Sequence, residues 1–210
     1  YPYFPKGTVF VAVVDPGVGS RRRAIAIELS GGFLVGPDNG IFGGVIETLG
    51  EDVVSAVELT NSKYWRAPEA SATFHGRDIF APAGAHLAGG VPITELGEAI
   101  DPGSLVRLPL PEVCWEEGAI EGCVQYIDSF GNLITNIPGA EVRGKNWRAI
   151  AGGKSIAAGD TYADCQWGEF VSIVSSSGWV EIAANGGSAE SLLGLEYGAR
   201  VRVLFVMEKK

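Results

Sequence analysis

Positive charge, histidine, paired cysteine and long apolar runs are all scarce in this sequence of 210 residues. No apolar run approaches the roughly 18 residues that cross a bilayer, so we exclude a membrane-spanning protein. Sixteen basic residues against 25 acidic ones give a net charge of −9, which leaves no broad basic surface for a phosphate backbone. We therefore expect neither a membrane nor a nucleic-acid partner, and small molecules become the best candidates.

The few cysteines and histidines exclude two further classes of protein. Cys114, Cys123 and Cys165 form no C-x-x-C pair, and their odd number fits no closed disulfide framework. We interpret them as reduced thiols and predict a cytoplasmic protein. His75 and His86 are the only histidines, so a histidine-rich zinc site is not expected and we predict no metal site.

The first half of the sequence alternates strand and helix patterns, which indicates an α/β domain. Residues 8–14 are apolar on both faces, as in the central strand of a mostly parallel sheet flanked by helices. Asn39 is a candidate N-cap for the first helix. Since a sheet seldom opens with its central strand, we expect that the chain lacks its first elements. The other expected strands are at 24–29, 33–35 and 53–59, and the expected helices are at 40–49 and 78–87.

The composition changes in the middle of the chain. Residues 91–121 hold seven acids and one base, Arg107, together with spaced prolines, which is typical of a connector rather than a binding patch. Beyond it, short strand patterns separated by glycine turns predict a smaller all-β domain, a barrel or a sandwich. The expected strands are at 119–127, 133–137, 170–175, 179–183 and 199–206, and a short helix is expected at 188–193. We therefore predict an α/β domain at 1–98, a linker at 99–111 and a barrel-like β domain at 112–210.

Polar, glycine-rich loops are the best candidates for carrying chemistry. The loop 15–23 directly follows a predicted buried strand, where the ligand crevices of open α/β sheets form, and the loop 36–40 follows another strand in the same way. His75 lies at the predicted start of the second helix. Each feature also has a structural interpretation, as a tight turn, a core histidine or, for Asp78, a helix N-cap.

Five motifs follow one another along nearly the whole chain. They are VVDPGVG at 13–19, VGPDNG at 35–40, TFHGRDIFAP at 73–82, IDSFGNLITNI at 127–137 and SSGWVEIAANGGSA at 176–189. Together they resemble the S-adenosyl-L-methionine hydrolases. That family is also called SAM hydroxide adenosyltransferase, formerly the domain of unknown function 62, and is related to the fluorinase and the chlorinase. Five motifs in the same order make the resemblance highly specific.

The resemblance implies an activity and a catalytic triad. Members convert S-adenosyl-L-methionine and water to adenosine and L-methionine by attack at ribose C5′, without a cofactor. The triad falls on Asp15, Arg22 and His75; Arg22 is chosen by its spacing from Asp15, and Arg21 or Arg23 remains an alternative. A sulfonium departs as a neutral thioether, whereas water is a weak nucleophile that has to be oriented and deprotonated. Asp15 and His75 are expected to hold that water as acceptors, and Arg22 to stabilise its hydroxide-like form.

The resemblance also implies the choice of nucleophile and the substrate contacts. Gly76 stands where the fluorinase has a serine that contacts fluoride, and the base-bearing triad favours water over a halide. Asp128 resembles the carboxylate that binds the methionine amino group, and Ser176 resembles its neighbour. Phe130 is expected to stack on adenine. The residues implied for the purine edge are Asn132, Asn185 and Gly186.

The last expectations concern the assembly of the protein and the alternatives to its expected function. Family members begin with a further strand that supplies an aspartate to the ribose, and this chain begins after it. They form trimers with the substrate between subunits, so we expect a homotrimer with its site at the subunit interface. Two alternatives stay open: a non-catalytic module that binds S-adenosylmethionine or adenosine and, as the weaker of the two, a halogenase that uses S-adenosylmethionine.

Overall fold

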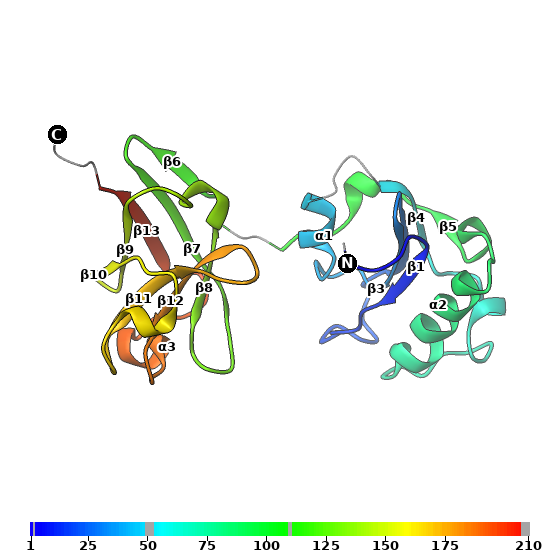
Figure 1. Ribbon diagram of the computed structural model, residues 1–210. Helices are drawn as coiled ribbons and strands as arrows, with labels where there is room; N and C mark the ends of the chain where they lie inside the picture. Colours follow the sequence, from blue (N-terminus) through cyan, green and yellow to red (C-terminus); the bar gives the residue numbers. More distant parts are fainter. Residues whose placement is uncertain (2, 49–52, 109–110, 207–210) are drawn as a thin grey trace. The chain divides into compact units, whose positions relative to one another are not determined.

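The computed structural model describes residues 1, 3–48, 53–108 and 111–206. Its internal contacts divide the chain into two compact units, Tyr1–Pro109 and Leu110–Lys210 (Figure 1). Each unit has its own buried apolar core. No helix within the described ranges is long and apolar enough to cross a membrane.

The first unit is built on a five-stranded sheet with the strand order β1-β3-β2-β4-β5 (Figure 1). The strands are β1 (Thr8–Val11), β2 (Ala24–Leu29), β3 (Gly32–Pro37), β4 (Val53–Glu58) and β5 (Glu98–Ala99). The helices are α1 (Gly43–Thr48), a π-helical turn (Gly76–Phe80) that runs into α2 (Ala81–Ala88), and 3-10 turns at Ser62–Tyr64, Ile93–Glu95 and Pro102–Ser104.

The predicted central, mostly parallel sheet is wrong. Only β1 and β3 pair in parallel among the described strands, whereas β2 runs antiparallel to both β3 and β4, and β5 runs antiparallel to β4. Just two residues, Ser30 and Gly31, join β2 to β3, and so short a connection allows only an antiparallel hairpin. β1 is an edge strand of the described sheet, and its last residue, Val11, is exposed.

Helices cover both faces of this mixed sheet, which explains why its strands are apolar on both faces. Ala24 and Ala26 of β2 pack in the cluster that contains the buried side chains of α2. The alternate residues, Ile25 and Ile27, pack in the cluster that contains those of α1. The apolar pattern of residues 24–29 therefore results from cover on both faces of the strand and does not indicate the direction of strand pairing.

The two predicted helices are present with different first residues. α1 begins at Gly43, so Asn39 lies too far before it to be its N-cap. The Asn39 Oδ1 accepts the Ile41 N–H, ahead of the helix, and its Nδ2 donates to the Val14 carbonyl. The predicted last residue, Leu49, lies outside the described residues. The second helix begins with a π-helical turn at Gly76, slightly before the predicted start.

Part of the segment that we predicted as a linker packs on the first unit. Leu105 is buried in the cluster around α1. The Val106 N–H donates to Asp38 Oδ1 over 2.9 Å. These contacts fasten the chain to the loop that follows β3.

The second unit is a nearly closed, antiparallel, barrel-like sheet with the order β10-β9-β13-β7-β8-β12-β11, and β6 pairs with β7 (Figure 1). A bridge between Ala158 and Ser172 joins the end of β10 to β11. The strands are β6 (Cys114–Glu116), β7 (Ala119–Ile127), β8 (Leu133–Pro138), β9 (Trp147–Ala151), β10 (Lys154–Ala157), β11 (Phe170–Val174), β12 (Trp179–Ala184) and β13 (Arg200–Phe205). The helices are α3 (Ala189–Leu193) and 3-10 turns at Gly139–Glu141 and Tyr162–Asp164.

Candidate active site

The loop between β1 and β2 holds an ion pair between Asp15 and Arg22. Arg22 Nε lies 3.0 Å from each carboxylate oxygen of Asp15, and Arg22 Nη2 donates to Oδ2 as well. The two side chains are 6% and 10% exposed, respectively. Arg22 also lies over the ring of the buried Phe80, with Cζ 5.2 Å from the ring centroid. The site thus keeps an anionic carboxylate against a donor of fixed geometry, largely shielded from water.

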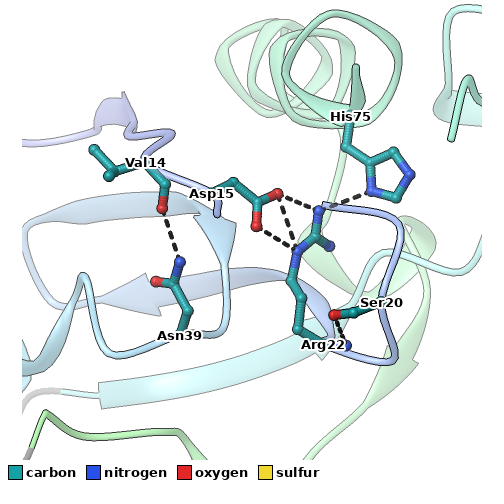
Figure 2. Close-up of polar contacts among 6 residues, drawn as sticks. All are labelled: Val14, Asp15, Ser20, Arg22, Asn39 and His75. Carbon is teal, nitrogen blue, oxygen red and sulfur yellow. Dashed lines mark hydrogen bonds and ion pairs between the residues drawn. The ribbon is translucent and has the colours of Figure 1, made fainter. Parts of the chain in front are cut away.

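Arg22 also joins Asp15 to His75, which precedes the π-helical turn. Arg22 Nη2 lies 2.8 Å from His75 Nδ1, and Figure 2 shows the guanidinium between the carboxylate and the imidazole. A guanidinium only donates hydrogen bonds, so Nδ1 accepts, and the neutral ring carries its proton on Nε2. One arginine therefore fixes both the carboxylate and the tautomer of the imidazole.

The charge state of His75 follows from its surroundings. Burial and then the Arg22 charge lower the pKa of His75 below its ordinary 6.5, while the charges of Asp15 and Asp78 act in the opposite direction. The imidazole is therefore neutral at neutral pH, in agreement with its role as the acceptor for Arg22. This charge state is lost as the pH falls through the lowered pKa of His75.

The side chains of the three consecutive arginines have different surroundings. Arg22 lies in the cluster just described. Arg23 turns toward Asp38, with Nε 2.8 Å from Oδ2, and Arg21 is exposed. Of the three, Arg22 is the one that contacts both Asp15 and His75.

The loop approaches the segment before His75 at Gly19. Gly19 has a φ of +78°, and a Cβ at this position would lie 2.6 Å from the Ala72 carbonyl oxygen. Both the left-handed conformation and the close approach require a glycine. The backbone at Gly19 therefore helps to bring Arg22 within reach of His75.

We expect Gly19→Ala to lower the free energy of unfolding by more than the roughly 1–2 kcal/mol that a left-handed conformation costs other residues. Gly7→Ala is the matched control, because Gly7 has a φ of +84° but nothing within 4 Å of a Cβ position. Urea denaturation of both variants measures the difference. Equal losses would show that the approach to Ala72 imposes no constraint.

Next to His75, Asp78 and Gly76 have different surroundings. The hydrogen bonds from Arg77 and then from the Ser71 N–H hold the pKa of the Asp78 carboxyl well below its usual range. Asp78 is buried inside the π-helical turn and does not cap it. A Cβ at Gly76 would lie 3.6 Å from Val13 Cγ1, which is an ordinary contact. The backbone thus leaves room for a Cβ atom at Gly76.

The residues implied for methionine and adenine lie on loops of the second unit. Asp128 and Ser176 line a cavity of about 390 Å³. Asp128 Oδ1 accepts the N–H groups of Phe130 and Asn132 at 2.9 Å, and Oδ2 accepts the Asn132 side-chain amide at 3.0 Å. This carboxylate therefore shapes its own loop, and the loop presents a Phe130 that is 76% exposed.

Two further residues of this cavity were missed by sequence reasoning. Tyr162 Oη donates to Glu181 Oε1 over 2.9 Å, and both residues line the cavity with Asp128. Burial and the hydrogen bond to Glu181 raise the pKa of Tyr162 to about 12, and burial together with the Asp128 charge raises the pKa of Glu181. The signal that was available is a glutamate inside an otherwise apolar strand, β12.

The last predicted loop of the second unit is held by side chains. Asn185 Nδ2 donates to the Cys165 carbonyl over 2.8 Å. Gly186 has a φ of +74°, and a Cβ there would lie 2.4 Å from the ring of Trp167, which is 81% exposed. Trp167 was not predicted, although an indole in a polar loop is an available signal.

Ligands for a metal ion do not gather in the described part of the chain, where no three histidine, cysteine, aspartate or glutamate side chains form such a group. Cys114, Cys123 and Cys165 are unpaired thiols.

Comparison with protein families accounts for most of the chain. Residues 1–97 match the SAM hydroxide adenosyltransferase N-terminal domain, and residues 122–202 match the corresponding C-terminal domain. These two regions contain all the residues of the candidate sites described above.

Individual relatives agree with the family models. An (R)-S-adenosyl-L-methionine hydrolase from Salinispora tropica is 44% identical over 96% of this chain and 76% of its own length. A fluorinase from Actinoplanes sp. is 28% identical over 96% of this chain and 78% of its own length. A crystal structure of an uncharacterized conserved protein from Thermotoga maritima superposes with a TM-score of 0.85 at 34% identity and covers 97% of this chain and 79% of that one. The chain belongs to the SAM hydroxide adenosyltransferase family.

Proposed function

We propose that this chain hydrolyses S-adenosyl-L-methionine to adenosine and L-methionine. The observation that carries the proposal is the cluster in which Arg22 binds both Asp15 and His75. The 44% identity to an (R)-S-adenosyl-L-methionine hydrolase supports the same substrate. A carboxylate base next to a fixed cation is what activation of water requires, and a sulfonium leaving group needs no acid.

In the proposed reaction, a water oxygen attacks ribose C5′ while the bond between C5′ and sulfur breaks. The electron pair of that bond stays on sulfur, which leaves as the neutral thioether of methionine. The proton of the water passes to the Asp15 carboxylate and then to solvent. Holding the water in line with the breaking bond supplies the proximity contribution to the rate.

The tautomer of His75 decides which of the two candidate bases, Asp15 or His75, accepts the proton of the water. His75 Nδ1 is occupied by Arg22, so the neutral ring faces the reaction with Nε2–H, which donates. Asp15 accepts from Arg22 on both oxygens but, as a carboxylate, has further lone pairs. We therefore assign proton acceptance to Asp15. We assign two roles to His75: it orients the water, and it holds the Arg22 side chain in position.

The substrate contacts of the second unit are part of the same proposal. Asp128 and Ser176 face the cavity that we assign to the methionine end, together with the Tyr162–Glu181 pair. The exposed ring of Phe130 offers a flat face for adenine. Asn132, Asn185 and Gly186 stay our proposal for the purine edge.

The assembly and setting also remain proposals. We propose that the chain acts without a cofactor in the cytoplasm, where its unpaired thiols stay reduced. We propose a homotrimer with the site at the subunit interface, and light scattering on the purified protein tests the trimer directly.

Hydrolysis and halogenation are separated by a competition assay. We expect the protein, incubated with S-adenosyl-L-methionine in about molar chloride, to release adenosine and methionine in equal amounts without a 5′-chloro nucleoside, since the anionic Asp15 repels a halide. Liquid chromatography with mass spectrometry measures all three compounds. A chlorinated product would identify a halogenase, and binding without any product would identify the non-catalytic module.

A further inference from the structure

The loop 36–40 has no part in the proposed reaction, yet it contacts both ends of the segment that carries Asp15 and Arg22. Its first two residues, Gly36 and Pro37, end β3, and it supplies two polar side chains, those of Asp38 and Asn39. Their partners are the residue just before Asp15 and the residue just after Arg22.

Asn39 holds the first end. Its Nδ2 donates to the Val14 carbonyl over 2.8 Å (Figure 2), and its Oδ1 accepts the Ile41 N–H over 3.2 Å. The Val14 side chain is 69% exposed and provides little packing of its own. β1 has already ended at Val11, so this hydrogen bond anchors the backbone directly before Asp15.

Asp38 holds the second end. It is buried, and its Oδ2 accepts from Arg23 Nε over 2.8 Å while its Oδ1 accepts from the Val106 N–H over 2.9 Å. The Asp38 N–H also donates to the Arg23 carbonyl over 3.0 Å. A buried carboxylate with these partners is a rigid anchor for the residue next to Arg22.

The segment between the anchors has mostly local hydrogen bonds. The Val18 N–H donates to the Asp15 carbonyl, and the Ser20 N–H donates to the Gly17 carbonyl. Such turns keep the shape of the loop but do not fix its position on the sheet. The contact of Arg22 with His75, across 53 positions of sequence, therefore depends on attachments outside the loop.

We propose that Asn39 and Asp38 are positioning residues that set the distance of the Asp15–Arg22 pair from His75. The relevance to catalysis rests on the proposed function, whereas the positioning itself does not. Loss of the Asn39 anchor lets the loop withdraw, which lengthens the Arg22–His75 contact and opens His75 to water.

The test uses the titration of His75, which requires no turnover. Four influences act on it: burial and Arg22 lower its pKa, and the weaker influences of Asp15 and Asp78 raise it. Withdrawal of the loop removes Arg22 and Asp15 together and reduces burial, so the net change is a rise. We expect Asn39→Ala to shift the His75 pKa upward, toward 6.5, in an NMR titration of the imidazole signals, with His86→Gln used for assignment.

Asn61→Ala is a closely matched control. Asn61 also donates through Nδ2 to a carbonyl over 2.8 Å, that of Glu95, and accepts from the N–H two residues later over 3.2 Å, in the same unit. This variant is expected to leave the His75 pKa unchanged. An unchanged pKa in Asn39→Ala, or an equal shift in Asn61→Ala, would overturn the proposal.

Kinetics then connect positioning with catalysis. We expect Asn39→Ala to lower kcat about tenfold or more with little change in KM, because the substrate contacts are left in place. A shifted His75 pKa in a protein that never turns over S-adenosyl-L-methionine would refute the proposed function but keep the positioning role. Full turnover with an unshifted pKa would refute the positioning role alone.

Discussion

Asp15→Asn is expected to lower kcat for S-adenosyl-L-methionine hydrolysis by about 10²–10⁴-fold, the usual contribution of a positioned general base. The amide keeps an acceptor for Arg22 but loses the negative charge and the ability to take a proton. KM is expected to change little, because Asp15 acts on the water rather than on the methionine or adenine groups. Steady-state release of adenosine, measured by liquid chromatography, gives both constants.

The matched control for Asp15→Asn is Asp160→Asn, the same chemical change at an exposed position of the second unit. It is expected to retain the parent activity. Because breaking a nearly buried ion pair also threatens stability, thermal melts of both variants show whether the protein is folded at the assay temperature. A folded Asp15→Asn variant with full activity would remove Asp15 from the mechanism.

Arg22→Lys is expected to lower kcat by about 10²–10³-fold although it keeps the positive charge. The guanidinium donates to both Asp15 oxygens and to His75 Nδ1 at once, from a planar fork that also lies over Phe80. An ammonium is a point charge with three donors and cannot hold this planar arrangement. The loss of kcat therefore measures the geometry of the bridge that Arg22 forms between Asp15 and His75, and not the charge of Arg22.

The neighbouring residue provides the control for the arginine. Arg21→Lys makes the same change at an exposed side chain one position earlier in the chain and is expected to leave kcat unchanged. Measuring both variants under the same conditions decides between Arg21 and Arg22. Equal activity of Arg22→Lys and Arg21→Lys would show that the bridge to His75 has no catalytic role.

The sequence predicted the position of most strands in the first unit but not how they pair. Residues 24–29 became β2, as the apolar pattern indicated. That pattern is the same for any strand covered on two faces, and the turn at Gly31 carried the information on direction. The strands β9 and β10 of the second unit were not predicted. They are defined by tertiary pairing, of β9 with β13 and of β10 with β9, and not by a local sequence pattern.

For the candidate site, the sequence suggested residues but not how they are connected. The family resemblance pointed to Asp15, Arg22 and His75, and the structure brings these three side chains together. The hydrogen bond between Arg22 and Nδ1 of His75 joins two segments that lie far apart in the sequence. The anchoring by Asn39 was hidden for a similar reason, since the same residue type in the same place also suits a helix N-cap.

The central claim, that water attacks ribose C5′ with Asp15 as the base, is tested most directly by hydrolysis in oxygen-18 water. The account predicts adenosine with one oxygen-18 at the 5′ position and unlabelled methionine, with His75→Ala and Asp15→Asn forming both products far more slowly. Mass spectrometry of the two products reads the label. Unlabelled adenosine, or label in the methionine, would contradict attack of water at C5′.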